Sequence, residues 1–284
     1  MRTERDSRLP PLVALGAALF FANAPALAAD ASDWSQDLRS AARLIAGVAR
    51  DGEMQAGVEI KLQPGWKTYW RYPGDSGVPP RFEFAGSDNL LRAQVLWPAP
   101  HAFNDEAGTA IGYKDAVIFP LRVVAREPGK PVTLRLKLDY AVCEKLCIPA
   151  QGRAELTLTG AKSEHAAAVA QAAGRVPQPT TASALQFSAK RVTSAAKPLV
   201  FIDLAAPGSN RIEVFAEGPN AEWALPIPKP ALGAPPGRRH FEMTLDGLPP
   251  GVSPIGPFEL TFTVVGGERP VELTTRLDEA PQGR

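Results

Sequence analysis

The sequence predicts an all-β protein in which an antiparallel β-sandwich is followed by a second, smaller β-sandwich. Apolar and polar residues alternate along many short segments, and residues 132–138 do so without interruption. This alternation is the pattern of half-buried strands. Glycine and proline pairs, such as residues 64–65 and 128–129, separate the segments. Short strands joined by frequent turns are typical of a sandwich.

The first sandwich is expected within residues 29–160. Its predicted strands are residues 58–62, 81–84, 91–97, 116–124, 132–140 and 154–158. Residues 34–49 mix apolar and polar side chains without a clear period, so their type is ambiguous.

A helix and a linker are expected between the two sandwiches, over residues 161–184. Residues 163–173 are rich in alanine, begin at Ser163 as a plausible N-cap and end before Gly174. Residues 176–181 contain two prolines and are predicted to form a stiff linker.

The second sandwich is expected over residues 185–284. Its predicted strands are residues 200–202, 211–215, 241–245, 258–265 and 271–277. Residues 219–236 are rich in proline and predict a long loop. Because this half contains no cysteine, we interpret it as a structural or partner-binding module.

The amino-terminal residues predict export. Three arginines within the first eight residues precede an apolar run at residues 12–21, and Ala26 and Ala28 frame an A-x-A cleavage pattern. These are the parts of a secretory signal peptide. We therefore expect a signal peptide over residues 1–28 and a periplasmic protein that is soluble, without membrane insertion, after cleavage.

The charge of the chain argues against nucleic acid as a partner. It has 31 basic and 30 acidic residues, a net charge of +1, and no basic run with interleaved aromatic residues.

Cys143 and Cys147 are the only cysteines of the chain. In an oxidising compartment such a close pair normally forms a disulfide. The pair lies between two predicted strands, and facing residues of an antiparallel hairpin have Cα atoms about 4.5–5.5 Å apart, within the range that a disulfide accepts. A bridge over so short a loop stabilises the fold by only about 2 kcal/mol. This weak stabilisation favours a redox role, and a bridge that only rigidifies the hairpin stays open as an alternative.

Copper binding is a further alternative. Cys-x3-Cys followed closely by Pro149 also resembles the site of Sco-type copper proteins, and two thiolates suit Cu(I). Such a site usually needs a histidine or methionine as another ligand, and none adjoins the cysteines. His101 is the histidine that we consider as a third ligand. No β-α-β pattern precedes the cysteines, although Sco-type proteins are thioredoxin-like.

Residues 53–159 resemble the amino-terminal periplasmic domain of the DsbD-type transmembrane thiol–disulfide reductase. Four segments carry the resemblance in the right order. They are GWKTYWR at residues 65–71, LWPAP at 96–100 followed by Phe103, IGYKDAV at 111–117, and YAVCEKLCIP at 140–149.

The resemblance implies an immunoglobulin-like sandwich whose cysteine pair passes electrons. The family receives them from a membrane-embedded partner through a thioredoxin-like domain and gives them to periplasmic oxidoreductases. Cys143 and Cys147 match the exchanging pair, and Cys147 matches the attacking cysteine. Tyr69 matches an aromatic residue beside the disulfide, Phe103 is the candidate cap that shields the bridge, and Tyr113 is a further neighbour.

The chain departs from the family pattern in three respects. Its cysteines have a shorter spacer, its cap loop at residues 101–112 does not align residue for residue, and the membrane helices and carboxy-terminal thioredoxin-like domain are absent. The second β-domain is similar to the enlarged amino-terminal region of ScsB-type proteins, so the chain resembles that region standing alone. The predicted function is periplasmic thiol–disulfide exchange without a cofactor, and the alternative from another class is a non-catalytic adaptor with a structural disulfide.

Overall fold

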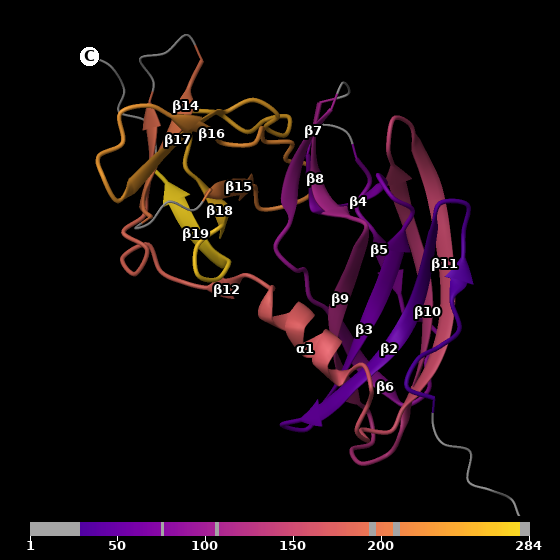
Figure 1. Ribbon diagram of the computed structural model, residues 1–284. Coiled ribbons are helices and arrows are strands. Elements are labelled where there is room, and N and C mark those ends of the chain that lie inside the picture. The colour runs from indigo at the N-terminus through magenta and orange to yellow at the C-terminus, as the bar shows by residue number, and fades with distance from the viewer. Residues whose placement is uncertain (1–28, 75–76, 106–107, 193–196, 207–210, 279–284) are drawn as a thin grey trace, which may run out of the picture.

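The computed structural model describes residues 29–74, 77–105, 108–192, 197–206 and 211–278 (Figure 1). The predicted signal peptide, residues 1–28, lies outside the described residues. Within the described ranges, no helix is both long and apolar enough to cross a membrane.

The predicted all-β fold class is confirmed. A first sandwich (residues 35–158) is followed by a helix and a second sandwich (residues 178–277), as Figure 1 shows. One sheet of the first sandwich has the order β1 (Ser35–Gln36), β2 (Ser40–Arg50), β3 (Glu53–Leu62), β9 (Ala116–Ala125), β6 (Leu90–Val95). The other has the order β11 (Cys147–Leu158), β10 (Val132–Cys143), β4 (Lys67–Gly74), β8 (Gly108–Lys114), β7 (His101–Asp105), and β5 (Arg81–Glu83) pairs with β10.

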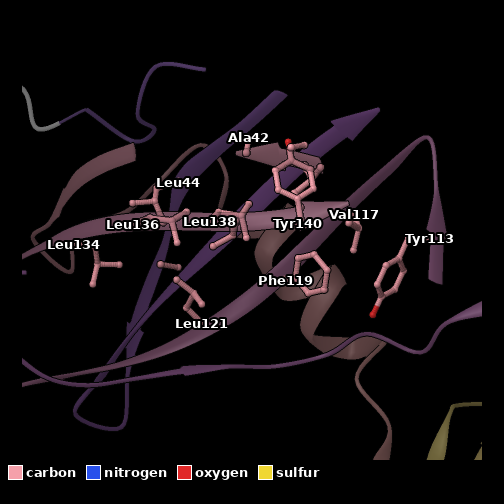
Figure 2. Close-up of a cluster of buried hydrophobic side chains, with 14 of the residues drawn as sticks. Ala42, Leu44, Tyr113, Val117, Phe119, Leu121, Leu134, Leu136, Leu138 and Tyr140 are labelled. Carbon is pink, nitrogen blue, oxygen red and sulfur yellow. The ribbon is translucent and has the colours of Figure 1, made fainter. Parts of the chain in front are cut away.

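The alternation along β10 sets the core of the first sandwich. Leu134, Leu138 and Tyr140 point inward and are buried, and they meet Phe119 of the opposite sheet in the same apolar cluster (Figure 2). Full burial of each large apolar side chain stabilises the fold by about 1.5–3 kcal/mol.

The second sandwich also contains two sheets. One has the order β12 (Gln178–Pro179), β19 (Val271–Leu277), β18 (Phe258–Val265), β15 (Glu213–Glu217). The other has the order β13 (Ser188–Val192), β14 (Leu199–Ala205), β17 (Arg238–Thr244), β16 (Lys229–Ala231). The β12–β19 pair is parallel, whereas the other pairs of these sheets are antiparallel.

The helix is present, but it begins later than the sequence predicts. α1 spans Ala166–Gly174, and its N-cap residue is His165 rather than Ser163. The Ser163 hydroxyl accepts a hydrogen bond from the His165 N–H at 3.0 Å and donates one to the Ala46 carbonyl at 2.8 Å. Ser163 therefore ties the approach to the helix onto β2, which moves the first helical residue further along the chain.

Several segments differ from the sequence-based expectation. The linker residues 176–181 include β12, and the proline-rich residues 219–236, expected as a loop, include β16. The ambiguous residues 34–49 lie mostly in β2, whose partners are β1 and β3. Residues 101–112, expected as a loop, lie mostly in the β7–β8 hairpin, where Phe103 pairs with Ala110. Sequence analysis did not separate this hairpin from a loop because its strands are short and broken by glycines.

Candidate redox site

The two cysteines close the β10–β11 hairpin. The pairing runs from Val132 opposite Leu158 to Cys143 opposite Cys147. The cysteines form a disulfide with a Cα–Cα distance of 4.2 Å, and residues 144–146 form the exposed turn between them. The spacing and the continuous strand register together bring the sulfurs into contact.

The two cysteine residues differ in their exposure to solvent. Cys143 is 4% exposed, whereas Cys147 is exposed. A thiolate arriving from solvent therefore reaches Cys147 first. Attack on the Cys147 sulfur breaks the bond and leaves the electron pair on Cys143.

Tyr69 on β4 reaches both sulfurs. Its hydroxyl lies 2.7 Å from Cys143 Sγ and 3.1 Å from Cys147 Sγ, and the residue is 2% exposed. Strand pairing explains this position, because Lys67 lies opposite Cys143 and Thr68 lies opposite Val142. The phenol O–H is a donor, and a thiolate is a much stronger acceptor than a disulfide sulfur.

The disulfide lies on the outer face of its sheet, away from the main core. Tyr69, Ala110, Ala141 and Cys143 form a small separate apolar cluster there. Gly77 lies directly against the tyrosine ring, since a Cβ at this position would come within 2.5 Å of Tyr69 Cε1. The ring is thus held between the sulfurs and the backbone of Gly77.

Phe103, the candidate cap residue, lies on β7 at the edge of the same sheet. It pairs with Ala110 of the disulfide cluster, and cross-strand partners point to the same face of a sheet. Its half-buried ring centroid lies 5.9 Å from Lys67 Nζ. Lys67 is itself buried and pairs with Cys143, so Phe103 lies on the same face as the disulfide, with Lys67 as their common neighbour.

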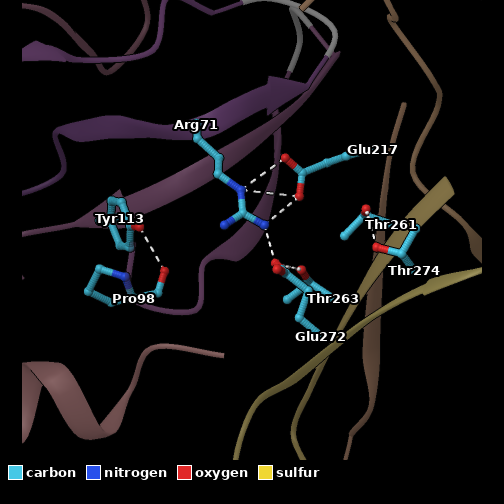
Figure 3. A network of polar contacts seen from close by, with 8 residues as sticks. All are labelled: Arg71, Pro98, Tyr113, Glu217, Thr261, Thr263, Glu272 and Thr274. Carbon is cyan, nitrogen blue, oxygen red and sulfur yellow. Dashed lines mark hydrogen bonds and ion pairs between the residues drawn. The ribbon is translucent and has the colours of Figure 1, made fainter. Parts of the chain in front are cut away.

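Tyr113 lies elsewhere. Its ring packs edge-on against Phe119 at 5.3 Å in the main core, and its hydroxyl donates to the Pro98 carbonyl at 2.8 Å (Figures 2 and 3). Burial raises the pKa of Tyr113 well above its ordinary value. Its side chain belongs to the interior and not to the cluster around Cys143.

The histidine considered as a copper ligand is engaged elsewhere. His101 Nδ1 lies 3.5 Å from a carboxylate oxygen of Glu213, and the hydrogen bond that this carboxylate accepts raises the pKa of His101. In the part of the chain that the structure describes, no group of three or more His, Cys, Asp or Glu side chains has the arrangement of a metal site. Among the described residues, the copper alternative is therefore supported by Cys143 and Cys147 and by no cluster of three such side chains.

Sequence analysis missed several neighbours of the disulfide. Ala110 and Gly77 are small and carry no chemical signal of their own. Lys67 lies in the GWKTYWR segment, where its spacing of two residues from Tyr69 places it on the same face of a strand. That spacing is the one signal that identifies Lys67 before the structure is known.

Comparisons with known proteins match the sandwich that carries this site. The family model "Thiol:disulfide interchange protein DsbD, N-terminal" matches residues 37–159. The chain is also similar to the crystal structure of the N-terminal periplasmic domain of ScsB from Proteus mirabilis. That similarity has a TM-score of 0.68 and 20% sequence identity, and it covers 88% of this chain and 99% of that chain. No curated protein matches the chain.

These matches confirm the resemblance to the DsbD-type amino-terminal domain. The family match covers the first sandwich with its cysteine pair, and the cysteine pair within it forms a disulfide. Residues 37–159 therefore match the amino-terminal domain of the thiol:disulfide interchange protein DsbD. The similarity to ScsB extends over both sandwiches and concerns their fold.

Proposed function

We propose that this chain is a periplasmic electron relay that exchanges thiols and disulfides through Cys143 and Cys147. The observation that carries the proposal is the arrangement of the bridge, with one exposed cysteine, one buried cysteine and a tyrosine hydroxyl within 3.1 Å of both sulfurs. The match of residues 37–159 to the DsbD amino-terminal family supports it. So does the weak stabilisation of about 2 kcal/mol that a bridge over so short a loop provides.

The proposed reaction has two halves. A donor thiolate attacks Cys147 Sγ, the Cys143–Cys147 bond breaks, and Cys143 leaves as a thiolate. A second donor thiol then attacks the mixed disulfide and releases Cys147, so that the donor dithiol is oxidised and the pair is reduced. In the second half, the reduced pair passes its electrons on. The Cys147 thiolate attacks an acceptor disulfide, and the Cys143 thiolate then attacks the mixed disulfide and restores the bridge.

The proposed partners are periplasmic thioredoxin-like oxidoreductases, with a membrane-embedded electron donor upstream. Their chemistry fits the site because an exposed Cys147 at the tip of a hairpin presents a sulfur to another protein's dithiol. Phe103, on the same face as the disulfide, is proposed to shield the bridge from stray thiols until such a partner docks.

A trapping experiment tests this function. The Cys143→Ala variant keeps the exposed Cys147 and lacks the resolving thiol, so it is expected to accumulate a mixed disulfide with an oxidised periplasmic thioredoxin-like protein. The Cys147→Ala variant is the matched control, and its buried Cys143 is expected to trap far less. Mass spectrometry after non-reducing electrophoresis identifies the adduct and the cysteine involved.

The reduction potential separates the relay from an adaptor with a structural bridge. Against a glutathione buffer, a structural disulfide has a potential below about −300 mV, and an exchanging pair lies above this value. A potential below that limit, together with no adduct in the Cys143→Ala variant, would contradict the proposed function.

A further inference from the structure

The strand that carries Tyr69 leaves its neighbour just after this residue. Tyr69 pairs with Gly112 of β8, and the next pair is Gly74 with Ala110. Residues 70–73 of β4 therefore lie opposite Ile111 alone and make no regular ladder with β8. We call residues 70–73 the β4 bulge.

The second sandwich holds the β4 bulge. Trp70 packs against Phe215 of β15 with ring centroids 5.9 Å apart. The Tyr72 hydroxyl donates to the Leu225 carbonyl at 2.6 Å. Arg71 makes the polar part of the contact (Figure 3). Its Nε and Nη2 donate to the Glu217 carboxylate at 3.0 and 2.7 Å, and Nη2 also donates to Glu272.

The three side chains of the ion-pair cluster around Arg71 are partly buried. The side chains of Arg71, Glu217 and Glu272 are 29%, 16% and 29% exposed. Burial alone would lower the pKa of Arg71, but the hydrogen bonds and charges of Glu217 and Glu272 raise it above its ordinary value. Removing the guanidinium would leave two carboxylates together in a partly buried place, which is costly.

The β4 bulge also forms part of the surroundings of the Tyr69 ring. A Cβ on Gly77 would lie 2.5 Å from Tyr69 Cε1 and 2.7 Å from Pro73 Cβ. The backbone of Gly77 is therefore in contact with both the tyrosine ring and the end of the bulge. A shift of the bulge moves these atoms and, with them, the hydroxyl that lies 2.7 Å from Cys143 Sγ.

We propose that Arg71 is a positioning residue of the redox site, because it anchors the β4 bulge to the second sandwich and thereby holds the Tyr69 hydroxyl on the two sulfurs. The inference rests on the proposed thiol–disulfide exchange and gives the second sandwich a part in it. When a thiolate attacks Cys147 Sγ, the electron pair of the broken bond stays on Cys143. The Tyr69 O–H then donates a hydrogen bond to this buried thiolate.

Reduction of the full chain by dithiothreitol tests the proposal. Tyr69→Phe is expected to slow reduction by about tenfold or more, the usual effect of losing a hydrogen bond to a charged group. Arg71→Gln is expected to slow it several-fold in the wild-type background. In the Tyr69→Phe background the same Arg71→Gln change is expected to have no further effect, because the hydroxyl that it positions is gone.

A titration of the reduced pair measures the pKa of a thiol, a quantity that does not change when a variant merely loses stability. Alkylation by iodoacetamide as a function of pH reports the pKa of the exposed Cys147 thiol. Both Arg71→Gln and Tyr69→Phe are expected to shift this profile to higher pH. Arg71→Lys retains the charge, so its profile is expected to lie between those of Arg71→Gln and the wild type.

The matched control is Arg238→Gln. Arg238 makes a similar bidentate ion pair with Asp203, at 2.8 and 2.6 Å, within the second sandwich and away from β4. Its side chain is 26% exposed, close to the value for Arg71. This variant is expected to lose stability without a change in the rate of reduction or in the alkylation profile.

Two outcomes would overturn the inference. One is that Arg71→Gln leaves the rate and the alkylation profile unchanged. The other is that it slows reduction equally with and without the Tyr69 hydroxyl. If Arg71→Gln fails to fold, Glu217→Gln removes one anchor more gently and is judged by the same criteria. Dithiothreitol needs no docking partner, so this result stands even where the trapping experiment above finds no adduct.

Discussion

At the level of single residues, Tyr69 is placed to contact the cysteine pair both as a disulfide and after reduction. Its hydroxyl lies within hydrogen-bond distance of both sulfurs in the disulfide, where each sulfur is a weak acceptor. After reduction a thiolate at either position is a far better acceptor for the same O–H. Tyr69 therefore stabilises the reduced pair more than the oxidised pair.

This difference predicts a lower reduction potential for Tyr69→Phe. A hydrogen bond to a charged group contributes about 1.5–3 kcal/mol, which corresponds to a fall of about 30–60 mV for a two-electron couple. Redox titration against glutathione measures it. Tyr140→Phe is the control, because the Tyr140 hydroxyl bonds Ser40 at 2.7 Å in the interior, and this variant is expected to keep the wild-type potential. Equal potentials for the Tyr69→Phe variant and the wild type would refute the assignment.

At the scale of elements, the packing of β4 depends on a residue that has no side chain. Gly77 does not have a positive φ, so alanine there is not strained by its backbone. The obstacle is steric, because a Cβ would lie 2.5 and 2.6 Å from two atoms of the Tyr69 ring. The absence of a side chain at Gly77 thus allows the ring to reach the sulfurs.

Gly77→Ala is therefore expected to cost about 1–3 kcal/mol of unfolding free energy, as overpacking usually does. Because the ring must move, the reduction potential is expected to shift in the same direction as in Tyr69→Phe. Gly174→Ala is the control, since a Cβ at the end of α1 would meet nothing within 4 Å. Urea unfolding and the glutathione titration give both quantities. An alanine at residue 77 that changes neither would contradict the described packing.

At the scale of the whole molecule, the two sandwiches share a core. Phe215 comes from β15 of the second sandwich, is fully buried, and belongs to the apolar cluster of the first sandwich, where it meets Trp70. Because the two sandwiches share this part of the core, we expect them to unfold together.

Phe215→Ala is expected to destabilise the protein by about 3–5 kcal/mol, the usual cost of such a truncation in a core. In the wild-type protein, near-ultraviolet and far-ultraviolet circular dichroism are expected to report one common unfolding transition. Phe201→Ala, at a half-buried position of β14, is expected to cost less. Two well-separated transitions in the wild-type protein would show that the shared core does not couple the halves.

The contact between His101 of the first sandwich and Glu213 of the second predicts a dependence of stability on pH. The hydrogen bond that Glu213 accepts from the His101 ring raises the pKa of His101 in the folded protein. The contribution of this pair is therefore fully present below the unfolded pKa of histidine, about 6.5. It is lost as the pH rises through the folded pKa.

The wild type is accordingly expected to be more stable than the His101→Gln variant, and this difference in unfolding free energy is expected to be larger at pH 6 than at pH 8.5. The His101 side chain is 66% exposed, so the difference is expected to stay below about 1 kcal/mol, as for other exposed ion pairs. Thermal unfolding at the two pH values measures it. A larger advantage at pH 8.5 would reverse the predicted sign.

Features that depend on near neighbours along the chain could be predicted from the sequence. The two-residue period of β10 predicted its buried face, and the short spacer between Cys143 and Cys147 was compatible with a bridged hairpin. The helix was predicted for the same reason, although its start was misplaced because Ser163 bonds to Ala46, far away in the sequence. The family segments supplied Tyr69 and Phe103 as candidates, without their geometry.

The assembly of the site depends on contacts between residues that are far apart in the sequence. Tyr69 is 74 residues from Cys143 along the chain, and Arg71 is 146 residues from Glu217. Contacts over such separations depend on strand order, on the register between sheets and on the packing of one sandwich against the other. No local pattern encodes these properties, because each is set by the burial of many side chains at once. The tyrosine on the sulfurs and the arginine behind it therefore appear only when the whole chain is folded.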